Sequence, residues 1–153
     1  MRWGNTLTKT LYFCNYLNVV NYKHRKVITC NLLSCHSQAV EKLRWHCPVI
    51  IIPRLERLCQ FCKQKIETPE HALLDCKSNP ELVNICEQFS ADIIIIIADL
   101  LNIERFGQTQ CLKNLISSQD TVSRVSQLAH DVLEIFDKYP IYVPGSEKNI
   151  FEV

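Results

Sequence analysis

The chain has 153 residues, of which 47% are hydrophobic and 22% charged, and its formal net charge is +1. This length suits one ordinary domain, the composition excludes a disordered chain, and the small number of Gly and Pro argues against a many-stranded β fold. The charge is unevenly distributed, because residues 1–65 carry 11 Lys and Arg against 2 acids whereas residues 66–153 carry 6 against 14. Either the basic half faces a polyanion or the two halves attract each other.

Helical periodicity begins after a weakly patterned lead-in at residues 1–22. Apolar residues recur every three to four positions in the segment 24–47, and the pattern is interrupted near Ser34–Ser37. The following segment is bracketed by Pro48 and Pro53, which predicts an extended conformation. Residues 59–66 then suit a turn or a small hairpin.

Two helix starts follow the cysteine-rich segment. Thr68 is a plausible N-cap and Pro69 suits the first helical position, which predicts a short helix. Ser78 or Asn79 caps a second, long helix that begins at Pro80. One face of this long helix carries Leu82, Ile85, Phe89, Ile93, Ile96 and Leu100. Its five consecutive isoleucines are β-branched and equally suit a buried strand, so both alternatives stay open.

A final amphipathic helix is predicted after a cap at Ser117 or Ser118. Its apolar positions are Val122, Val125, Ala129, Val132 and Phe136. The elements together predict a mostly α fold: a small helical domain with one zinc knuckle (CxxC…HxxxxC) between helices. We expect a lead-in at 1–22, a helical zinc-binding domain at 23–144 with its knuckle at 54–76 and helical tail at 78–139, and a terminal tail at 145–153.

Four residues in the knuckle have the spacing of metal ligands. Cys59 and Cys62 stand two residues apart, and His71 and Cys76 return from a capped helix start with four residues between them. Thiolate and imidazole are the ligands that Zn²⁺ prefers, and this spacing predicts a zinc site. Because all four ligands come from the protein, no position remains for a catalytic water, and the expected role is structural.

The other cysteines are interpreted as small buried residues or ordinary thiols, namely Cys14, Cys30, Cys35, Cys47 and Cys111. No pairing rule supports a second site that would combine Cys35 and Cys47 with His36 and His46. The amino terminus lacks a signal-peptide pattern, and the isoleucine-rich segment is too short to span a membrane. We therefore expect an intracellular chain, nuclear or cytoplasmic, with reduced cysteines.

The segment "RLCQFCKQKIETPEHALLDC", residues 57–76, resembles a known zinc-binding region. This region lies downstream of the reverse transcriptase in non-LTR (LINE-type) retrotransposon polyproteins, particularly the fungal ones. Residues 24–45 are similar to the helix that precedes the knuckle in that family, and residues 128–144 to its helical tail. The resemblance covers residues 23–144 and is strongest at 54–76. It places Cys59, Cys62, His71 and Cys76 on the ligand positions, and Arg54 and Arg57 on the family's basic lead.

The resemblance implies a module that helps to bind the nucleic acid of the element, RNA or DNA. Phosphates would be contacted by Arg44, Arg54, Arg57, Lys63 and Lys65. Phe61 offers a stacking face for an unpaired base, or it packs under the metal. Since the paired aspartates and the palm domain of a polymerase are missing from the sequence, we expect a remnant or a free-standing tail that does not reverse transcribe.

Two alternatives belong to other classes of protein. The chain could be a helical protein-interaction domain or an inert retroelement remnant in which zinc is only structural, and the acidic carboxyl-terminal helices would then suit a protein partner. An enzyme is disfavoured, because the sequence has neither a glycine-rich phosphate loop nor an activated nucleophile motif. Glu67, Glu70 and Asp75 are interpreted as cap and surface residues instead of ligands of a two-metal centre.

Overall fold

The computed structural model describes residues 14–45, 51–96 and 107–145. These residues form six α-helices and no strand, which confirms the prediction of a mostly helical fold. The helices are α1 (Tyr22–Leu32), α2 (Ala39–Trp45), α3 (Pro69–Leu74), α4 (Pro80–Ile96), α6 (Gln108–Ser117) and α7 (Val122–Asp137), with short 3-10 helices η2 (Asn15–Asn18) and η3 (Arg54–Glu56).

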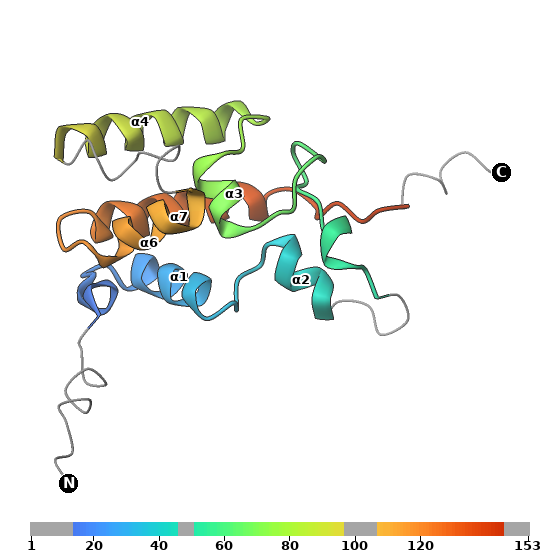
Figure 1. The fold of residues 1–153 in the computed structure, drawn as a ribbon, viewed down its shortest axis with the longest axis horizontal. Helices are drawn as coiled ribbons and strands as arrows, with labels where there is room; N and C mark the ends of the chain where they lie inside the picture. The colour runs from blue at the N-terminus through green and yellow to red at the C-terminus, as the bar shows by residue number, and fades with distance from the viewer. Residues whose placement is uncertain (1–13, 46–50, 97–106, 146–153) are drawn as a thin grey trace, which may run out of the picture.

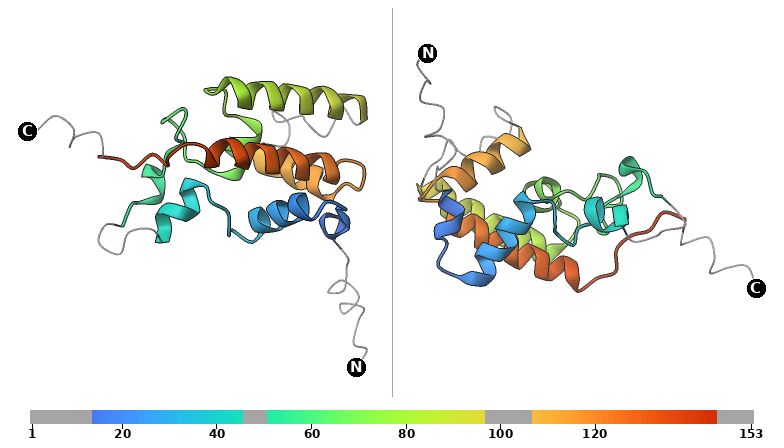
Figure 2. Two further views of the ribbon diagram at one scale, coloured as in Figure 1. Left: turned by 180° about the vertical axis from the view of Figure 1, so that it is seen from behind. Right: turned by 90° about the horizontal axis from the view of Figure 1, so that it is seen from below.

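Helix α7 is the centre of the molecule. It packs against α1 on one side and α4 on the other, with α6 alongside (Figure 1). The view from behind shows the same order of helices (Figure 2). The buried faces of these helices meet in one core that includes Ile28 from α1, Ile93 from α4, Leu115 from α6 and Val132 from α7. Because α1 comes from the basic half of the chain and α7 from the acidic half, the two halves form a single core.

The break between α1 and α2 has a local cause. Leu32 ends α1, and Ser34 adopts a left-handed conformation with φ of 54°. The backbone N–H of Cys35 then donates to the carbonyl of Cys30 at 2.9 Å, and that of Ser34 to the carbonyl of Asn31 at 3.4 Å. This pair of bonds closes a helix in a Schellman motif, so the interruption predicted near Ser34–Ser37 is confirmed.

Asn79 caps the long helix α4, because its side-chain oxygen accepts from the backbone N–H groups of Glu81 at 2.8 Å and Leu82 at 3.2 Å. Residues Ile93 to Ile96 continue this helix, so the alternative of a strand is wrong for these four isoleucines. The face predicted to be buried is buried at Leu82, Phe89 and Ile93, whereas Ile96 is exposed. Leu100 lies outside the described residues.

The cap predicted for the last helix is wrong. Ser117 is the final residue of α6, and Ser118 lies at the carboxyl-terminal end of that helix. Helix α7 instead starts at Val122 after Thr121, whose buried hydroxyl donates to the carbonyl of Leu115 at 2.6 Å. Residues 108–117 lie within the predicted helical tail at 78–139, but no separate start signal marks α6, because Gly107 has no side chain to cap it.

The chain segments before α1 and after α7 both pack against the helices. Val19, from the predicted lead-in, is buried. Near the other end, Ile141 and Val143 pack against a small second cluster made by α2 and Ile52. None of the helices in the described part of the chain has the length and apolar character needed to cross a bilayer.

Candidate metal centre

A tight hairpin positions the first two cysteines. Leu58 and Ile66 form an isolated antiparallel bridge, and the N–H of Cys59 donates to the carbonyl of Lys65 at 2.8 Å. Residues 58–66 are called the cysteine hairpin below. Its turn is closed by a bond from the N–H of Lys63 to the carbonyl of Cys59 at 2.8 Å, and Lys63 has φ of 51°. The turn or small hairpin predicted for this segment is confirmed.

Helix α3 positions the other two residues. The Thr68 hydroxyl oxygen accepts from the N–H of His71 at 3.2 Å, and Pro69 is the first helical residue, as predicted. His71 lies within the helix, whereas Cys76 lies just beyond its end. The N–H of Cys76 still donates to the carbonyl of His71 at 2.8 Å, so the chain turns back toward the cysteine hairpin.

The side chains of Cys59, Cys62, His71 and Cys76 converge on one point. The sulfurs of Cys59 and Cys76 are 3.7 Å apart, and the sulfur of Cys62 lies 3.4 Å from Nε2 of His71. All four donor atoms lie within 4.8 Å of one another, and three of the four residues are buried. This cluster could hold a metal ion. Cys86, which could replace Cys76 as a ligand by its position in the sequence, lies outside the cluster, and its thiol donates to the carbonyl of Leu73 at 3.5 Å.

Backbone N–H groups surround the sulfurs. Those of Phe61 and Cys62 donate to Cys59, and those of Gln64 and Lys65 donate to Cys62. Hydrogen bonds of this kind stabilise a thiolate, which is the form of cysteine that binds metals. These N–H groups favour the thiolate at both residues, but at Cys59 the hydrogen bond to Cys76 and burial outweigh them.

Without a metal ion, hydrogen bonds among the four side chains determine which of them are protonated. The Cys59 thiol donates to Cys76, which raises the pKa of Cys59 and lowers the pKa of Cys76 to about 4. Burial alone would lower the pKa of His71, but hydrogen bonds to Cys76, Asp75 and Cys62 raise it to about 9. A metal ion must therefore displace protons from Cys59 and His71.

Asp75 orients the imidazole. Its carboxylate accepts from Nδ1 of His71 at 3.0 Å and also pairs with the Lys65 ammonium at 2.5 Å. Because Nδ1 is engaged in this way, Nε2 is the nitrogen that faces the sulfurs of the cluster, and it lies 3.4 Å from the sulfur of Cys62. A carboxylate behind a ligating histidine is a recurrent feature of metal centres. Asp75 is thus more than the surface residue that the sequence indicated.

Glu67 is the clearest correction to the sequence analysis. It was expected at the surface, but it is only 1% exposed. One carboxylate oxygen accepts from the N–H of Ala39 in α2, and the other from the N–H of Gln60 in the cysteine hairpin, both at 2.8 Å. Glu67 therefore connects α2 to the hairpin that carries two of the potential metal ligands. Sequence spacing gave no sign of this, because Ala39 is 28 positions away.

The residues predicted to contact nucleic acid fall into two groups. Arg44, Arg54 and Arg57 line one cavity of about 530 Å³ on the α2 side of the molecule. The Arg57 guanidinium also donates to the carbonyls of Ile52 at 3.0 Å and Val40 at 2.7 Å. These two hydrogen bonds stabilise the fold, so only part of the guanidinium is available for a ligand.

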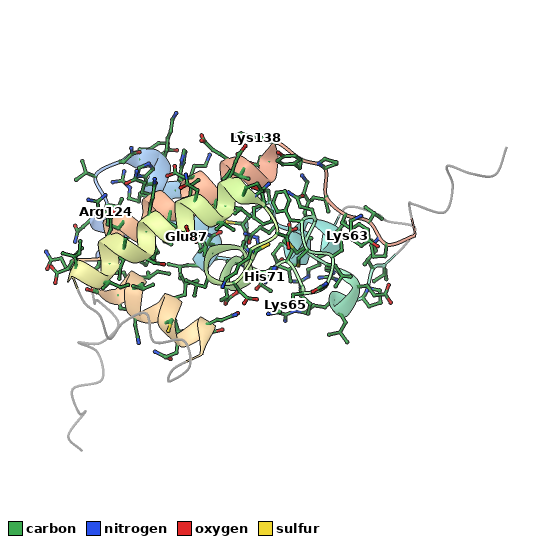
Figure 3. The ribbon with its side chains drawn as sticks, turned by 90° about the horizontal axis from the view of Figure 1, so that it is seen from above. Lys63, Lys65, His71, Glu87, Arg124 and Lys138 are labelled. Carbon is green, nitrogen blue, oxygen red and sulfur yellow. The ribbon has the colours of Figure 1, made fainter. Side chains whose placement is uncertain are left out.

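The second group lies on or near the cysteine hairpin. The Phe61 ring packs edge-on against Phe136 and Tyr139, with centroid distances of 4.8 and 5.3 Å, so it anchors the hairpin to the end of α7. The Lys63 ammonium lies 5.0 Å from the centre of the Tyr142 ring. Lys65 is paired with Asp75. The two lysines are exposed beside His71, whereas Arg124 lies at the opposite end of the molecule (Figure 3).

The remaining cysteines vary in environment. Cys111 is buried as expected, Cys14 and Cys30 are half-buried, and Cys35 is exposed. Cys47 and His46 lie outside the described residues. A second group of potential ligands, which the sequence analysis missed, consists of His130, Asp131 and Glu134 on α7. It is partly exposed, and its carboxylates pair with the imidazole of His130 at 3.3 and 3.6 Å.

Comparisons with protein-family models, with curated proteins and with solved structures find no match for this chain.

Proposed function

We propose that this protein is a non-catalytic, zinc-stabilised helical module that binds nucleic acid through basic side chains beside the metal. This is the role implied by its resemblance to the zinc-binding region that follows the reverse transcriptase in LINE-type polyproteins. The observation that carries the proposal is the closed cluster of three sulfurs and one imidazole nitrogen within 4.8 Å of one another.

The spacing of the donor atoms supports zinc. With Zn–S near about 2.3 Å and Zn–N near about 2.0 Å, a tetrahedron has edges of about 3.8 Å between sulfurs and about 3.5 Å between sulfur and nitrogen. The observed separations are 3.7 Å for Cys59 to Cys76 and 3.4 Å for Cys62 to His71. A donor set of three thiolates and one imidazole is typical of structural zinc sites, which leave no coordination position for a substrate.

Nucleic acid as the partner is supported by the placement of the basic residues. Lys63 and Lys65 project from the cysteine hairpin, and Arg54 is exposed on η3, directly before that hairpin in the chain. Phosphate contacts made by such side chains give an affinity that is independent of sequence and weakens with salt. We therefore propose binding to single strands of RNA or DNA through phosphate contacts that do not depend on the base sequence.

Zinc is tested by elemental analysis of the full chain purified under reducing conditions. We expect one zinc per chain, lost in Cys62→Ser together with helical content, because structural zinc contributes folding free energy. The matched control is Cys35→Ser, which removes an exposed thiol outside the cluster and should keep the metal. If the unaltered chain carries no zinc, the structural-zinc part of the proposal fails.

Nucleic-acid binding is tested by fluorescence anisotropy with single-stranded RNA and DNA oligonucleotides over a range of salt concentrations. We expect the logarithm of the association constant to fall linearly with the logarithm of salt concentration. Lys63→Gln should reduce the slope by about 1, as expected for one lost phosphate contact. Arg124→Gln removes the same charge at the opposite end of the molecule and should leave the slope unchanged (Figure 3).

A second candidate is protein interaction through α4. The last turn of this helix exposes Ile94 at 58% and Ile95 at 85%, a degree of apolar exposure typical of interaction surfaces. This function predicts that oligonucleotides bind weakly and without a steep salt dependence. The anisotropy experiment above therefore separates the two candidates.

A further inference from the structure

A cavity formed by the described residues is separate from the cluster of potential metal ligands. It has a volume of about 530 Å³ and lies between α1, α2, η3, the start of α3, and α6. This volume falls in the range of about 300–1,000 Å³ that is typical of small-molecule sites. None of the four potential metal ligands lines it.

The charge of the cavity favours an anion. Arg44 lines it from α2, Arg54 from η3, Arg57 from the residue after η3, and Lys113 from α6. Two carboxylates also line it, those of Glu41 and Glu70, and Glu41 lies 3.7 Å from the Arg44 guanidinium. Four cations against two anions leave a net positive wall. Guanidinium groups suit phosphate because of their planar, forked donors.

Two of the residues that line this cavity each have a side-chain polar atom without a hydrogen-bond partner among the described residues. These atoms are the side-chain oxygen of Asn31 and Nδ1 of His36, and both atoms are shielded from solvent. Buried polar atoms are normally paired, because an unpaired one costs free energy on folding. Burial also lowers the pKa of His36, so its imidazole is neutral and its Nδ1 can accept or donate according to the tautomer. We expect a ligand that carries hydrogen-bonding edges to pair with these two side chains.

Apolar side chains complete the lining. Ile28 and Leu32 come from α1, Val40 from α2, and Leu112 and Ile116 from α6. A matching ligand therefore has an anionic group, a body that tolerates apolar contact, and polar edges. A nucleotide has all three features: a phosphate, the faces of a base, and the amino or carbonyl groups on its edge.

We propose that this cavity binds one nucleotide, with the phosphate at Arg54 and Lys113 and the base against the apolar wall near Asn31 and His36. The inference rests on the proposed function, since the nucleotide would be an unpaired residue of the bound strand. The strand backbone then lies along the lysines of the cysteine hairpin, and one base enters the cavity.

The test uses the zinc-loaded full chain and isothermal titration with adenosine 5′-monophosphate as the probe. Adenosine and inorganic phosphate serve as comparison ligands that each lack one part of the nucleotide. We expect each part alone to bind at least about tenfold more weakly than the whole, because each forgoes charge-assisted or apolar contacts. Equal binding of inorganic phosphate and the nucleotide would overturn the proposal that the base enters the cavity.

Variants locate the site. Lys113→Gln and Asn31→Leu should each weaken nucleotide binding by roughly tenfold, since they remove one polar contact. Lys42→Gln is the matched control, because Lys42 is exposed on α2 and does not line the cavity. Lys113 is also exposed, so its replacement should leave the fold intact, which circular dichroism checks. Nucleotide binding that is unchanged in both variants would overturn the inference.

The same variants with an oligonucleotide separate this inference from the proposed function. If the oligonucleotide binds with a steep salt dependence that Lys113→Gln and Asn31→Leu leave unaltered, the nucleic-acid function stands and the cavity inference fails. If the nucleotide binds in the cavity but oligonucleotides do not bind, the cavity is a site for free nucleotides and the proposed function fails. If neither binds, both are wrong.

Discussion

At the scale of single residues, two left-handed positions mark the turns on which the fold depends. Ser34 ends α1 with φ of 54°, and Lys63 closes the turn of the cysteine hairpin with φ of 51°. Residues with a Cβ atom adopt this region at a cost of roughly 1–2 kcal/mol, which glycine avoids. The hydrogen bonds and packing around each turn must therefore offset the free-energy cost of its left-handed residue.

Replacing Ser34 by glycine should stabilise the protein. The Schellman motif after α1 would keep its two backbone hydrogen bonds and lose the Cβ strain, so we expect the free energy of unfolding to rise by about 1 kcal/mol in urea. Ser90→Gly in the interior of α4 is the control and should lower it by about 0.5 kcal/mol. A lower free energy of unfolding in the Ser34 variant would mean that the serine hydroxyl stabilises the fold by more than the left-handed backbone conformation destabilises it.

Asp75 should govern the affinity for metal. The substitution Asp75→Asn replaces the carboxylate that holds Nδ1 of His71, so we expect the affinity for zinc to fall by about 10–100-fold in competition with a chelator. Asp92→Asn changes an equivalent group in a surface ion pair with Arg124 and should have no effect. Equal affinities for the two variants would show that His71 needs no such support.

At the scale of elements, Glu67 connects two parts that sequence separates. Its carboxylate accepts from α2 and from the cysteine hairpin, and the carbonyl of the same residue accepts from the N–H of Val40 at 3.3 Å. Helix α2 carries one side of the nucleotide cavity. The metal centre and the cavity are therefore joined through one buried side chain.

Glu67→Gln tests this connection. Glutamine offers one acceptor oxygen where two N–H groups need partners, so one of the N–H groups of Ala39 and Gln60 loses its bond. We expect the free energy of unfolding of the zinc-loaded protein to fall by about 1–3 kcal/mol. Glu87→Gln, at an exposed position of α4, should change it by less than about 0.5 kcal/mol. If the free energy of unfolding of the Glu67 variant is unchanged, the free-energy cost of burying the carboxylate must equal the stabilisation that its hydrogen bonds provide.

Elements defined by local signals were predictable from the sequence. The cap at Thr68, the proline after it and the spacing of Cys59 and Cys62 act within a few residues, and the short helix and the hairpin formed as expected. Helix α6 was not predicted as a separate helix, because it follows a glycine and is held mainly by burial of Leu112 and Leu115 against distant partners. The burial of Glu67 and the cavity depend on long-range packing, which periodicity does not encode.

At the scale of the whole molecule, metal binding should be linked to pH. Cys59 and His71 hold protons before a metal binds, and the pKa of His71 is raised to about 9. Because a bound zinc ion would displace these protons, we expect the apparent affinity for zinc to rise between pH 6 and pH 9, by up to about tenfold per pH unit for each proton.

Calorimetry in buffers of different ionisation enthalpy measures the protons released. Cys35→Ser should show the same pH dependence as the unaltered chain, because Cys35 lies outside the cluster. An affinity that is flat across this range would show that the four donors are already deprotonated in the folded protein.

The central position of α7 has a consequence for folding during synthesis. The four donor atoms are complete once Cys76 has been made, only 17 positions after Cys59, and so short a loop closes at little entropic cost. Helix α1 finds its main partner only when Val122–Asp137 leaves the ribosome. We therefore expect the four potential ligands to be able to meet before α7 is available, and α7 to complete the core when it packs between α1 and α4.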